Sequence, residues 1–172
     1  MQLFLIIFKG RVLSAPLPWS INAEKLLFLG KDKTLMTLKD YLNTGDRFAA
    51  GSGARLMEIA PGSAVAELKV TSAHLNAGGV CQGGAIFTLA DLVFAALVNQ
   101  GENLTFAINS TIYYHVSARE GDVLRAEGHI SCAHHRLPTA EVEVTNQDGV
   151  RIATFTGQAY TGRSPLPIDA LQ

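Results

Sequence analysis

The sequence predicts an α+β domain in which an antiparallel sheet wraps around one long, buried helix. Residues 85–98 form a nearly unbroken apolar run of helical length, and Asp91 is the only formally charged residue between Lys69 and Glu102. Two strand-like runs precede this segment, and about four follow it, separated by turn signals. A helix that is apolar on every side must be covered by other elements, and the flanking strands provide a sheet that can cover it.

The elements before the long helix are a short helix and a hairpin. Thr37 is a capping residue, and apolar side chains follow it at helical spacing: Leu38, Tyr41 and Leu42. Strands are expected over residues 55–60 and 64–71, because the sequence Pro61-Gly62-Ser63 between them favours a tight turn. A glycine-rich loop, residues 76–84, then leads into the long helix.

The long helix is expected to end near Asn99, with Gly101 as its C-cap, because glycine readily adopts the left-handed conformation that closes many helices. The rest of the chain reads as strands separated by turns. These strands are expected over residues 104–116, 123–133, 139–145 and 150–160, with a turn at Asp148-Gly149 before the last of them.

We expect the chain to have three parts. Residues 1–35 show no clear period and form an N-terminal appendage, residues 36–163 form a single folded domain, and residues 164–172 form a C-terminal tail. Met36 is a candidate for the start of translation, and a start there would place the appendage outside the native protein. If the appendage is translated, we expect it to be disordered or to pack against the domain.

The overall composition excludes several classes of function. With 14 basic and 15 acidic side chains, the chain lacks the positive surface of a nucleic-acid-binding protein. The apolar run is shorter than the roughly 20 residues that span a bilayer, and Lys9 and Arg11 follow the first apolar residues, opposite to a secretory signal, so no membrane association is expected. Only Cys81 and Cys132 are present, which favours reduced thiols and a cytoplasmic location. The hydrophobic content of 48% favours a homo-oligomer that buries apolar surface between its subunits.

Asp91 is the first candidate for chemistry. An unpaired carboxylate costs several kcal/mol to bury, so a sequence that places one in an apolar helix usually gains another benefit. Burial also raises the pKa of a carboxyl group above its ordinary value of about 3.9 and makes the group a better base. Asp91 would attack a carbonyl carbon directly or activate a water molecule. The structural alternative is a hydrogen bond to a neighbouring strand.

Gly83 and Gly84 are expected at the start of the long helix. The first N–H groups of a helix lack intrahelical acceptors and carry the positive end of the helix dipole, so they suit an oxyanion; the alternative is a tight turn that packs strand against helix. Asp91 lies about 12 Å along the helix from Gly83, too far for one carbonyl group to contact both. Two antiparallel helices related by a two-fold axis would bring Gly83 of one subunit to Asp91 of the other, so we expect an inactive monomer.

The remaining candidate residues carry weaker signals. Cys81 has no identifiable general base nearby and is expected to be a buried, non-catalytic thiol. His134 and His135 are adjacent, and on a strand their side chains would point to opposite faces, so we expect no metal site. Together with Arg136 they form a small basic group that suits a phosphate, or an ordinary solvated loop.

The segment of residues 74–91, HLNAGGVCQGGAIFTLAD, carries a family resemblance. It has an asparagine, a short glycine-containing loop, a pair of glycines at the start of the helix, and then Leu-Ala-Asp. This pattern resembles the signature of hotdog-fold acyl-CoA thioesterases of the phenylacetate-pathway (PaaI-like) group. The likeness runs from about Met36 to Gly162 and excludes residues 1–35.

The resemblance implies a hotdog fold and hydrolysis of an acyl-CoA thioester, aryl-acyl or short to medium aliphatic, to free acid and CoA. It implies that Asp91 is the catalytic carboxylate, Gly83 the oxyanion-hole amide and Asn76 a residue that orients substrate or water. Substrate contacts are further expected from Gly84 and from apolar side chains that shape the acyl pocket: Phe87, Phe94 and Leu75. No cofactor is implied. The implied active unit is a homodimer that binds coenzyme A along the subunit boundary, and two dimers pair as a homotetramer.

Two positions depart from the family pattern. Gln82 stands where many relatives have histidine; its amide can hydrogen-bond the thioester, but it cannot change protonation state. Ala107 stands where some relatives have a serine that helps to position water. Because of Gln82, a non-catalytic acyl-CoA-binding or sensing protein of the same fold is the alternative function. A hotdog dehydratase is disfavoured, since the loop of residues 76–84 contains no histidine.

Overall fold

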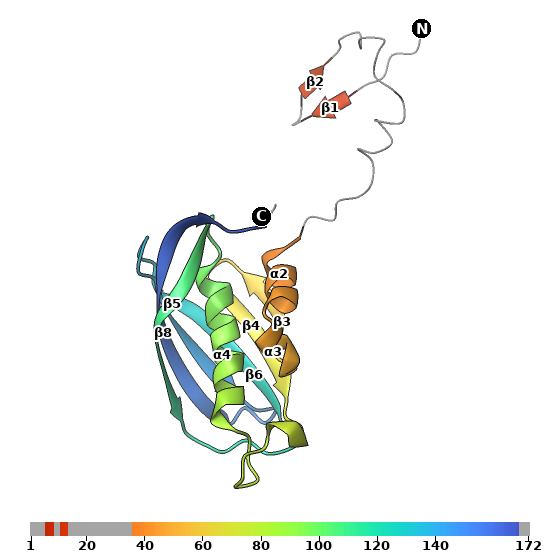
Figure 1. Ribbon diagram of the computed structural model, residues 1–172, viewed down its shortest axis with the longest axis vertical. Helices are drawn as coiled ribbons and strands as arrows, with labels where there is room; N and C mark the ends of the chain where they lie inside the picture. The colour runs from red at the N-terminus through yellow and green to blue at the C-terminus, as the bar shows by residue number, and fades with distance from the viewer. Residues whose placement is uncertain (1–5, 9–10, 14–35, 169–172) are drawn as a thin grey trace. The chain divides into compact units, whose positions relative to one another are not determined.

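The computed structural model describes residues 6–8, 11–13 and 36–168 (Figure 1). The chain divides into two units, Met1–Thr34 and Leu35–Gln172. In the first unit, β1 (Ile6–Phe8) and β2 (Arg11–Leu13) form an antiparallel pair. The other expectations for the appendage, and those for the tail beyond residue 168, concern residues outside the described part of the chain.

The second unit contains a six-stranded sheet and a long helix, α4 (Gly83–Val98). Its strands are β3 (Arg55–Ala60), β4 (Ser63–Lys69), β5 (Asn103–Tyr114), β6 (Val123–Cys132), β7 (Thr139–Thr145) and β8 (Arg151–Pro165). They lie in the order β3-β4-β6-β7-β8-β5, with every neighbouring pair antiparallel. Figure 1 shows the sheet curving behind α4. The predicted α+β fold, an antiparallel sheet around one buried helix, is confirmed.

The inner face of α4 and the concave face of the sheet form the core. The helix contributes large buried side chains, among them Leu89, Val93, Phe94 and Leu97. Glycines in two strands allow this close approach, since a Cβ on Gly157 would lie 2.7 Å from the Phe94 ring. A Cβ on Gly128 would likewise lie 2.9 Å from the Leu97 side chain. Larger residues at these positions would push the helix away from the sheet.

Two consecutive amide side chains hold the C-terminal end of α4. Asn99 donates hydrogen bonds to the carbonyl oxygens of Ala95 and Thr105, both at 3.0 Å, and accepts one from Thr105 N at 2.9 Å. Gln100 accepts from Gly62 N at 2.9 Å and also donates to the β3–β4 turn. The expectation that Gly101 caps the helix is wrong: Asn99 is the C-cap, because its amide pairs the backbone groups at the junction with β5.

Two short helices lie beside α4 along the β3 edge of the sheet (Figure 1). The predicted helix is α2 (Leu38–Gly45), and its predicted cap, Thr37, accepts a hydrogen bond from Asp40 N at 3.1 Å. A further helix, α3 (Arg47–Gly51), was not predicted; Asp46 caps it by accepting from Ala49 N at 2.9 Å. Among the described helices, none has the length and hydropathy needed to cross a membrane.

Candidate functional site

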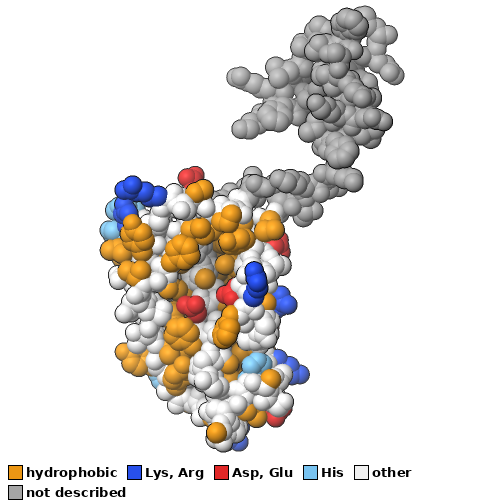
Figure 2. Space-filling view, in the orientation of Figure 1, with side chains coloured by type: hydrophobic (Ala, Val, Ile, Leu, Met, Phe, Trp, Pro, Cys, Tyr) orange, Lys and Arg blue, Asp and Glu red, His pale blue; other side chains and the backbone are white. Residues whose placement is uncertain are grey.

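The outer face of α4 is the part of the helix that the sheet does not cover (Figure 1). Residues at helical spacing along this face stay partly accessible: Gly84, Thr88, Asp91 and Ala95. Figure 2 shows acidic side chains in the middle of this side of the molecule, bordered by hydrophobic ones. A charged group surrounded by accessible apolar surface is a candidate functional site, because ordinary solvent-facing helix surfaces are broadly polar.

Asp91 lies half-buried on this face, next to a cavity of about 250 Å³. Its carboxylate forms no hydrogen bond or ion pair with any other residue that the structure describes, so the structural alternative, a hydrogen bond to a neighbouring strand, lacks the contact that it requires. Burial raises the pKa of Asp91, and the nearby charge of Asp46 raises it further. The result is an unpaired carboxylate with increased basicity at the wall of a cavity.

The remaining wall of the Asp91 cavity is mainly apolar. Ala107 of β5 belongs to it, beside aromatic and aliphatic side chains from α2, α4, β5 and the segment after β8: Tyr41, Leu42, Phe94, Leu104, Phe106 and Leu166. Of these, only Phe94 was expected from the sequence to line the acyl pocket. The others come from three separate segments, and no local pattern in the sequence indicates that they meet.

The N-terminal end of α4 presents a backbone donor, Gly83 N–H, to the surroundings. Gln82 is the N-cap, and its side-chain oxygen accepts a hydrogen bond from Gly84 N–H. On the other side, the Tyr114 hydroxyl donates to the Gly83 carbonyl oxygen at 2.9 Å. Gly83 N–H itself has no acceptor among the described residues. This amide therefore remains available to an oxyanion, with the positive end of the helix dipole behind it.

Gly83 also has a packing role. A Cβ at this position would lie 2.9 Å from both Cζ and Oη of Tyr114, so no larger residue fits without moving the tyrosine ring. The sequence left open whether the glycines serve packing or binding. At Gly83 the structure combines close packing on one side with a free N–H group, and the two readings do not exclude each other.

Asn76 holds the glycine-rich loop before α4. Its side-chain oxygen accepts hydrogen bonds from Gly78 N at 2.8 Å and Val80 N at 3.4 Å, and its backbone N–H donates to Val80 O at 2.8 Å. The side chain is exposed, and its NH₂ group has no partner among the described residues. The oxygen therefore shapes the loop, and the NH₂ group is the part that can contact a ligand.

A second cavity, of about 520 Å³, opens beside the start of α4. It is lined by Gln82, Gly84 and Phe87, together with polar and apolar side chains from α3 and the loop: Phe48, Ser52, His74 and Leu75. The three side chains expected to shape one acyl pocket are thus divided, because Phe87 and Leu75 line this cavity and Phe94 lines the other. Gly84 and Asp91 are separated by about 10 Å of helix, so one chain does not bring them together.

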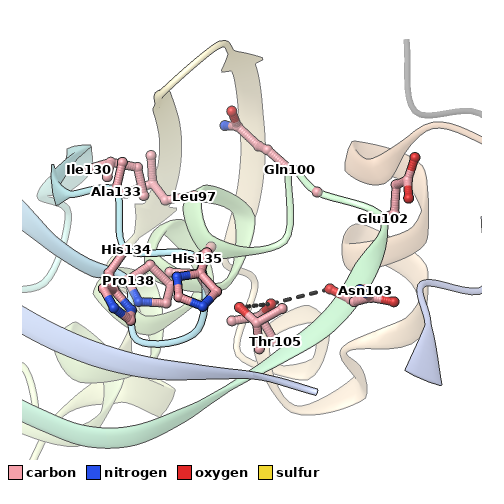
Figure 3. Close-up of a pocket in the computed structure, with 13 residues that line it drawn as sticks. Leu97, Gln100, Glu102, Asn103, Thr105, Ile130, Ala133, His134, His135 and Pro138 are labelled. Carbon is pink, nitrogen blue, oxygen red and sulfur yellow. Dashed lines mark hydrogen bonds between the residues drawn. The ribbon is translucent and has the colours of Figure 1, made fainter. Parts of the chain in front are cut away.

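His134 and His135 lie at a third cavity, of about 270 Å³, near the C-terminal end of α4 (Figure 3). The argument that their side chains would point to opposite faces of a strand does not apply, because β6 ends at Cys132 and both residues lie in the following loop. Their ring centroids are 4.6 Å apart. Nδ1 of His134 accepts a hydrogen bond from Leu137 N at 2.9 Å and thereby shapes the loop.

Arg136 does not line this cavity with the two histidines. Its guanidinium lies over the Tyr160 ring, 5.2 Å from the centroid, and donates a hydrogen bond to the Tyr160 hydroxyl. The predicted basic group is therefore divided into a histidine pair and a stacked arginine. Cys81 is buried, and burial, followed by the charge of Asp122, raises the pKa of its thiol, which makes it a weak nucleophile.

Comparison with known proteins gives a consistent picture. The sequence profile of the thioesterase superfamily matches residues 78–153, which include the start of α4 and Asp91. A candidate esterase from Archaeoglobus fulgidus is 36% identical over 137 residues, covering 80% of this chain and 89% of that protein. Acyl-coenzyme A thioesterase PaaI of Escherichia coli is 29% identical over 115 residues, covering 67% of this chain and 82% of that protein.

Solved structures show the same likeness. The E. coli PaaI structure matches with a TM-score of 0.67 and 25% identity, covering 76% of this chain and 98% of that chain. A Streptococcus mutans protein solved with acetyl-CoA bound matches with a TM-score of 0.60 and 25% identity, covering 62% of this chain and 86% of that chain. These proteins share the fold of this chain, an antiparallel sheet around one long helix.

Proposed function

This chain belongs to the thioesterase superfamily, and from that premise we propose that it hydrolyses acyl-CoA thioesters, aryl-acyl or short to medium aliphatic, to free acid and CoA. It has the hotdog fold of the PaaI-like proteins and is a thioester hydrolase. The observation that carries the mechanism is the carboxylate of Asp91, half-buried, without a partner among the described residues, and facing an apolar cavity.

Coenzyme A as the carrier of the acyl group is supported by the relatives. PaaI of E. coli is named as an acyl-coenzyme A thioesterase, and the S. mutans structure holds acetyl-CoA. We propose that the mainly apolar Asp91 cavity receives the acyl group. The second cavity, which offers the Ser52 hydroxyl and the Gln82 NH₂ group as polar contacts, suits the amide-containing arm of CoA. Both cysteines are unpaired, which supports a cytoplasmic location.

A second copy of the chain would complete the site, and the edge strand β5 supports this. Strand β5 lies at one edge of the sheet and is 12 residues long. Phe106 and Ile108 on this strand are 63% and 55% exposed. Long apolar edge strands are prone to pair with another chain unless they are covered. We propose that β5 pairs with β5 of a second subunit in a homodimer, and that two dimers pair as a homotetramer.

The outer face of α4 would lie against the same face of the partner's helix in this dimer. Small side chains at Gly84, Thr88 and Ala95 let two helices approach closely. With the helices antiparallel, Gly83 of one subunit reaches Asp91 of the other, which overcomes their separation of about 12 Å within one chain. Sedimentation velocity on the full chain distinguishes monomer, dimer and tetramer.

The reaction that we propose has a simple proton balance. Gly83 N–H of one subunit binds the thioester carbonyl oxygen, and the NH₂ groups of Gln82 and Asn76 are near enough to the loop to orient the substrate. Asp91 of the other subunit removes a proton from water, whose oxygen attacks the carbonyl carbon. The C–S bond then breaks, the free acid forms, and the CoA thiolate takes the proton from Asp91. Direct attack by Asp91 would give an anhydride that water then cleaves to the same products.

The loop after β6 is the proposed site for the CoA phosphates. His134 and His135 present two rings side by side, and Arg136 lies next to them in sequence, held on Tyr160. The Arg136 guanidinium can give charge-assisted hydrogen bonds to a phosphate, and a histidine ring N–H can add a further donor. Replacement of His135 by alanine should raise KM for acyl-CoA several-fold with little change in kcat, because the phosphates are remote from the reacting carbonyl group.

The deciding experiment is thiol release from a panel of aromatic and aliphatic acyl-CoA substrates, with the wild type and Asp91→Asn side by side. The proposal expects hydrolysis by the wild type and a rate at least about a hundredfold lower for the variant, as for other positioned acid–base groups. If the wild type binds acyl-CoA, measured by calorimetry, but releases no thiol, the non-catalytic sensing function replaces this proposal.

A further inference from the structure

We infer that the Tyr114 hydroxyl, together with Gln82, is a positioning device that fixes the peptide between Gly83 and Gly84 and thereby orients the Gly83 N–H toward the substrate. This inference rests on the proposed thioesterase function. It adds a residue of β5 to the groups proposed to act on the thioester, which otherwise come from the glycine-rich loop, the start of α4 and Asp91.

The device holds both ends of one peptide group. The peptide between Gly83 and Gly84 carries the Gly83 carbonyl oxygen, which accepts from the Tyr114 hydroxyl at 2.9 Å. Its other end, Gly84 N–H, donates to the Gln82 side-chain oxygen. With both polar atoms held by side chains from opposite directions, the plane of this peptide cannot rotate without breaking one of the two hydrogen bonds.

Such support is needed because of the glycine pair. Glycine has access to more backbone conformations than any other residue, and the first turn of a helix lacks part of the backbone hydrogen bonds of its interior. Gly83 and Gly84 form this turn, and Gly83 N–H belongs to the preceding peptide, whose carbonyl oxygen, Gln82 O, accepts from Ala85 N at 3.0 Å. With the peptides on both sides of the Gly83 Cα held, the backbone of Gly83 cannot turn, and without this support the direction of its N–H would vary. A donor that stabilises an oxyanion is effective when its direction is fixed before the reaction.

Tyr114 is well placed to give this support. It comes from β5, and its ring lies so close to Gly83 that an added Cβ would lie 2.9 Å from Cζ. The ring therefore holds Gly83 by contact as well as by the hydrogen bond. Burial raises the pKa of the hydroxyl above its ordinary value, so Tyr114 stays protonated at neutral pH and remains a donor.

The matched pair of variants Tyr114→Phe and Tyr113→Phe tests the inference. Tyr114→Phe keeps the ring on Gly83 and removes the donor. Tyr113→Phe makes the same chemical change at the next residue of β5, whose side chain is 62% exposed and forms no hydrogen bond with a described residue. Steady-state kinetics on the best acyl-CoA substrate would be measured for the full chain. The expected result is a roughly tenfold lower kcat with KM nearly unchanged for Tyr114→Phe, less than the loss of a direct oxyanion donor, and no change for Tyr113→Phe.

Amide hydrogen exchange separates positioning from folding. In Tyr114→Phe, exchange at Gly84 should become faster while that of the core strands stays as in the wild type. Equal kcat values for Tyr114→Phe and the wild type would overturn the inference and leave the thioesterase function intact. Faster exchange throughout the domain, together with the lower kcat, would overturn it in favour of a purely structural role. A wild type that hydrolyses no acyl-CoA would overturn the inference together with the proposed function.

Discussion

The carboxylate of Asp46, the cap of α3, acts on the carboxyl group of Asp91 on α4 and raises its pKa beyond the increase that burial alone produces. The two residues belong to different helices and are far apart in sequence. Their proximity places a like charge beside the group that the proposed mechanism uses as a base. Asp46 is thus an element of the site that lies outside the family signature.

The pH dependence of hydrolysis should reflect this relationship. Asp91 acts as a base or nucleophile only when ionised, so kcat/KM should fall as the pH drops through its pKa. Because this pKa is raised, the acid limb should lie above the value of about 3.9 that is ordinary for aspartate. Asp46→Asn keeps a good helix cap and removes the charge, so it should move the limb to lower pH. Asp148→Asn, on the β7–β8 turn, is the control. If the acid limb of kcat/KM lies at the same pH in both variants, the prediction is wrong.

Ionisation of Asp91 should lower the free energy of unfolding over the same pH range in which it raises the activity. A raised pKa means that the folded protein holds this proton more tightly than the unfolded chain does. Stability therefore falls as the pH rises through the window between the ordinary and the raised pKa, and it stays lower above that window. Asp91→Asn lacks this penalty, so it should melt at a higher temperature than the wild type at neutral pH. Thermal unfolding should show the difference shrinking toward pH 4, and a variant that is less stable at every pH would refute the argument.

Leu166 should affect the choice of acyl group. This residue follows β8, is 6% exposed and lines the Asp91 cavity. Leu166→Ala enlarges the cavity by about three methylene-sized groups, each worth roughly 0.8 kcal/mol of apolar contact, so the optimum should shift to longer or bulkier acyl groups by up to roughly 50-fold in relative kcat/KM. Val150→Ala, at an exposed turn, is the control. An unchanged order of substrates in the Leu166 variant would place the acyl group elsewhere.

Asn99 should be one of the most sensitive polar residues of the domain. Its side chain is 6% exposed and pairs with both backbone groups of Thr105. Asn99→Ala leaves buried backbone groups without partners, at roughly 1–3 kcal/mol for each group, so we expect a loss of about 3 kcal/mol in the free energy of unfolding. Chemical denaturation measures this. Asn103→Ala, the matched control, removes an amide that has no side-chain hydrogen bond among the described residues and should cost much less.

Much of the fold is predictable because the signals that determine it are local. The apolar run around Asp91 predicts α4, and Pro61-Gly62-Ser63 predicts the turn between β3 and β4. The predicted bounds of β3 and β7 agree with the structure, whereas β8 continues to Pro165, beyond the predicted end. Helix α3 is only five residues long, too short to show a hydrophobic period. The one local signal for it is Asp46, a residue type that commonly caps helices and here accepts from Ala49 N.

The site was only partly predictable, for a related reason. Asp91 is visible in the sequence because it interrupts an apolar run, and Gly83 because it opens a helix. Tyr114 and Leu166 reach the site from β5 and from the segment after β8, so only the folded chain brings them close. The role of the Gln82 side-chain oxygen as the cap of α4 was likewise not predicted, and its NH₂ group remains for the hydrogen bond to a thioester that the sequence suggests.

The distance of about 12 Å along α4 between Gly83 and Asp91 has a consequence for mixtures of defective chains. In the proposed dimer each active site takes its amide from one chain and its carboxylate from the other. A chain with a damaged helix start and a chain with Asp91→Asn are each inactive alone. When the two assemble with one another, one site receives both defects and the other receives none. Co-expression of the two inactive proteins would thus yield hybrid molecules with half of the normal number of working sites.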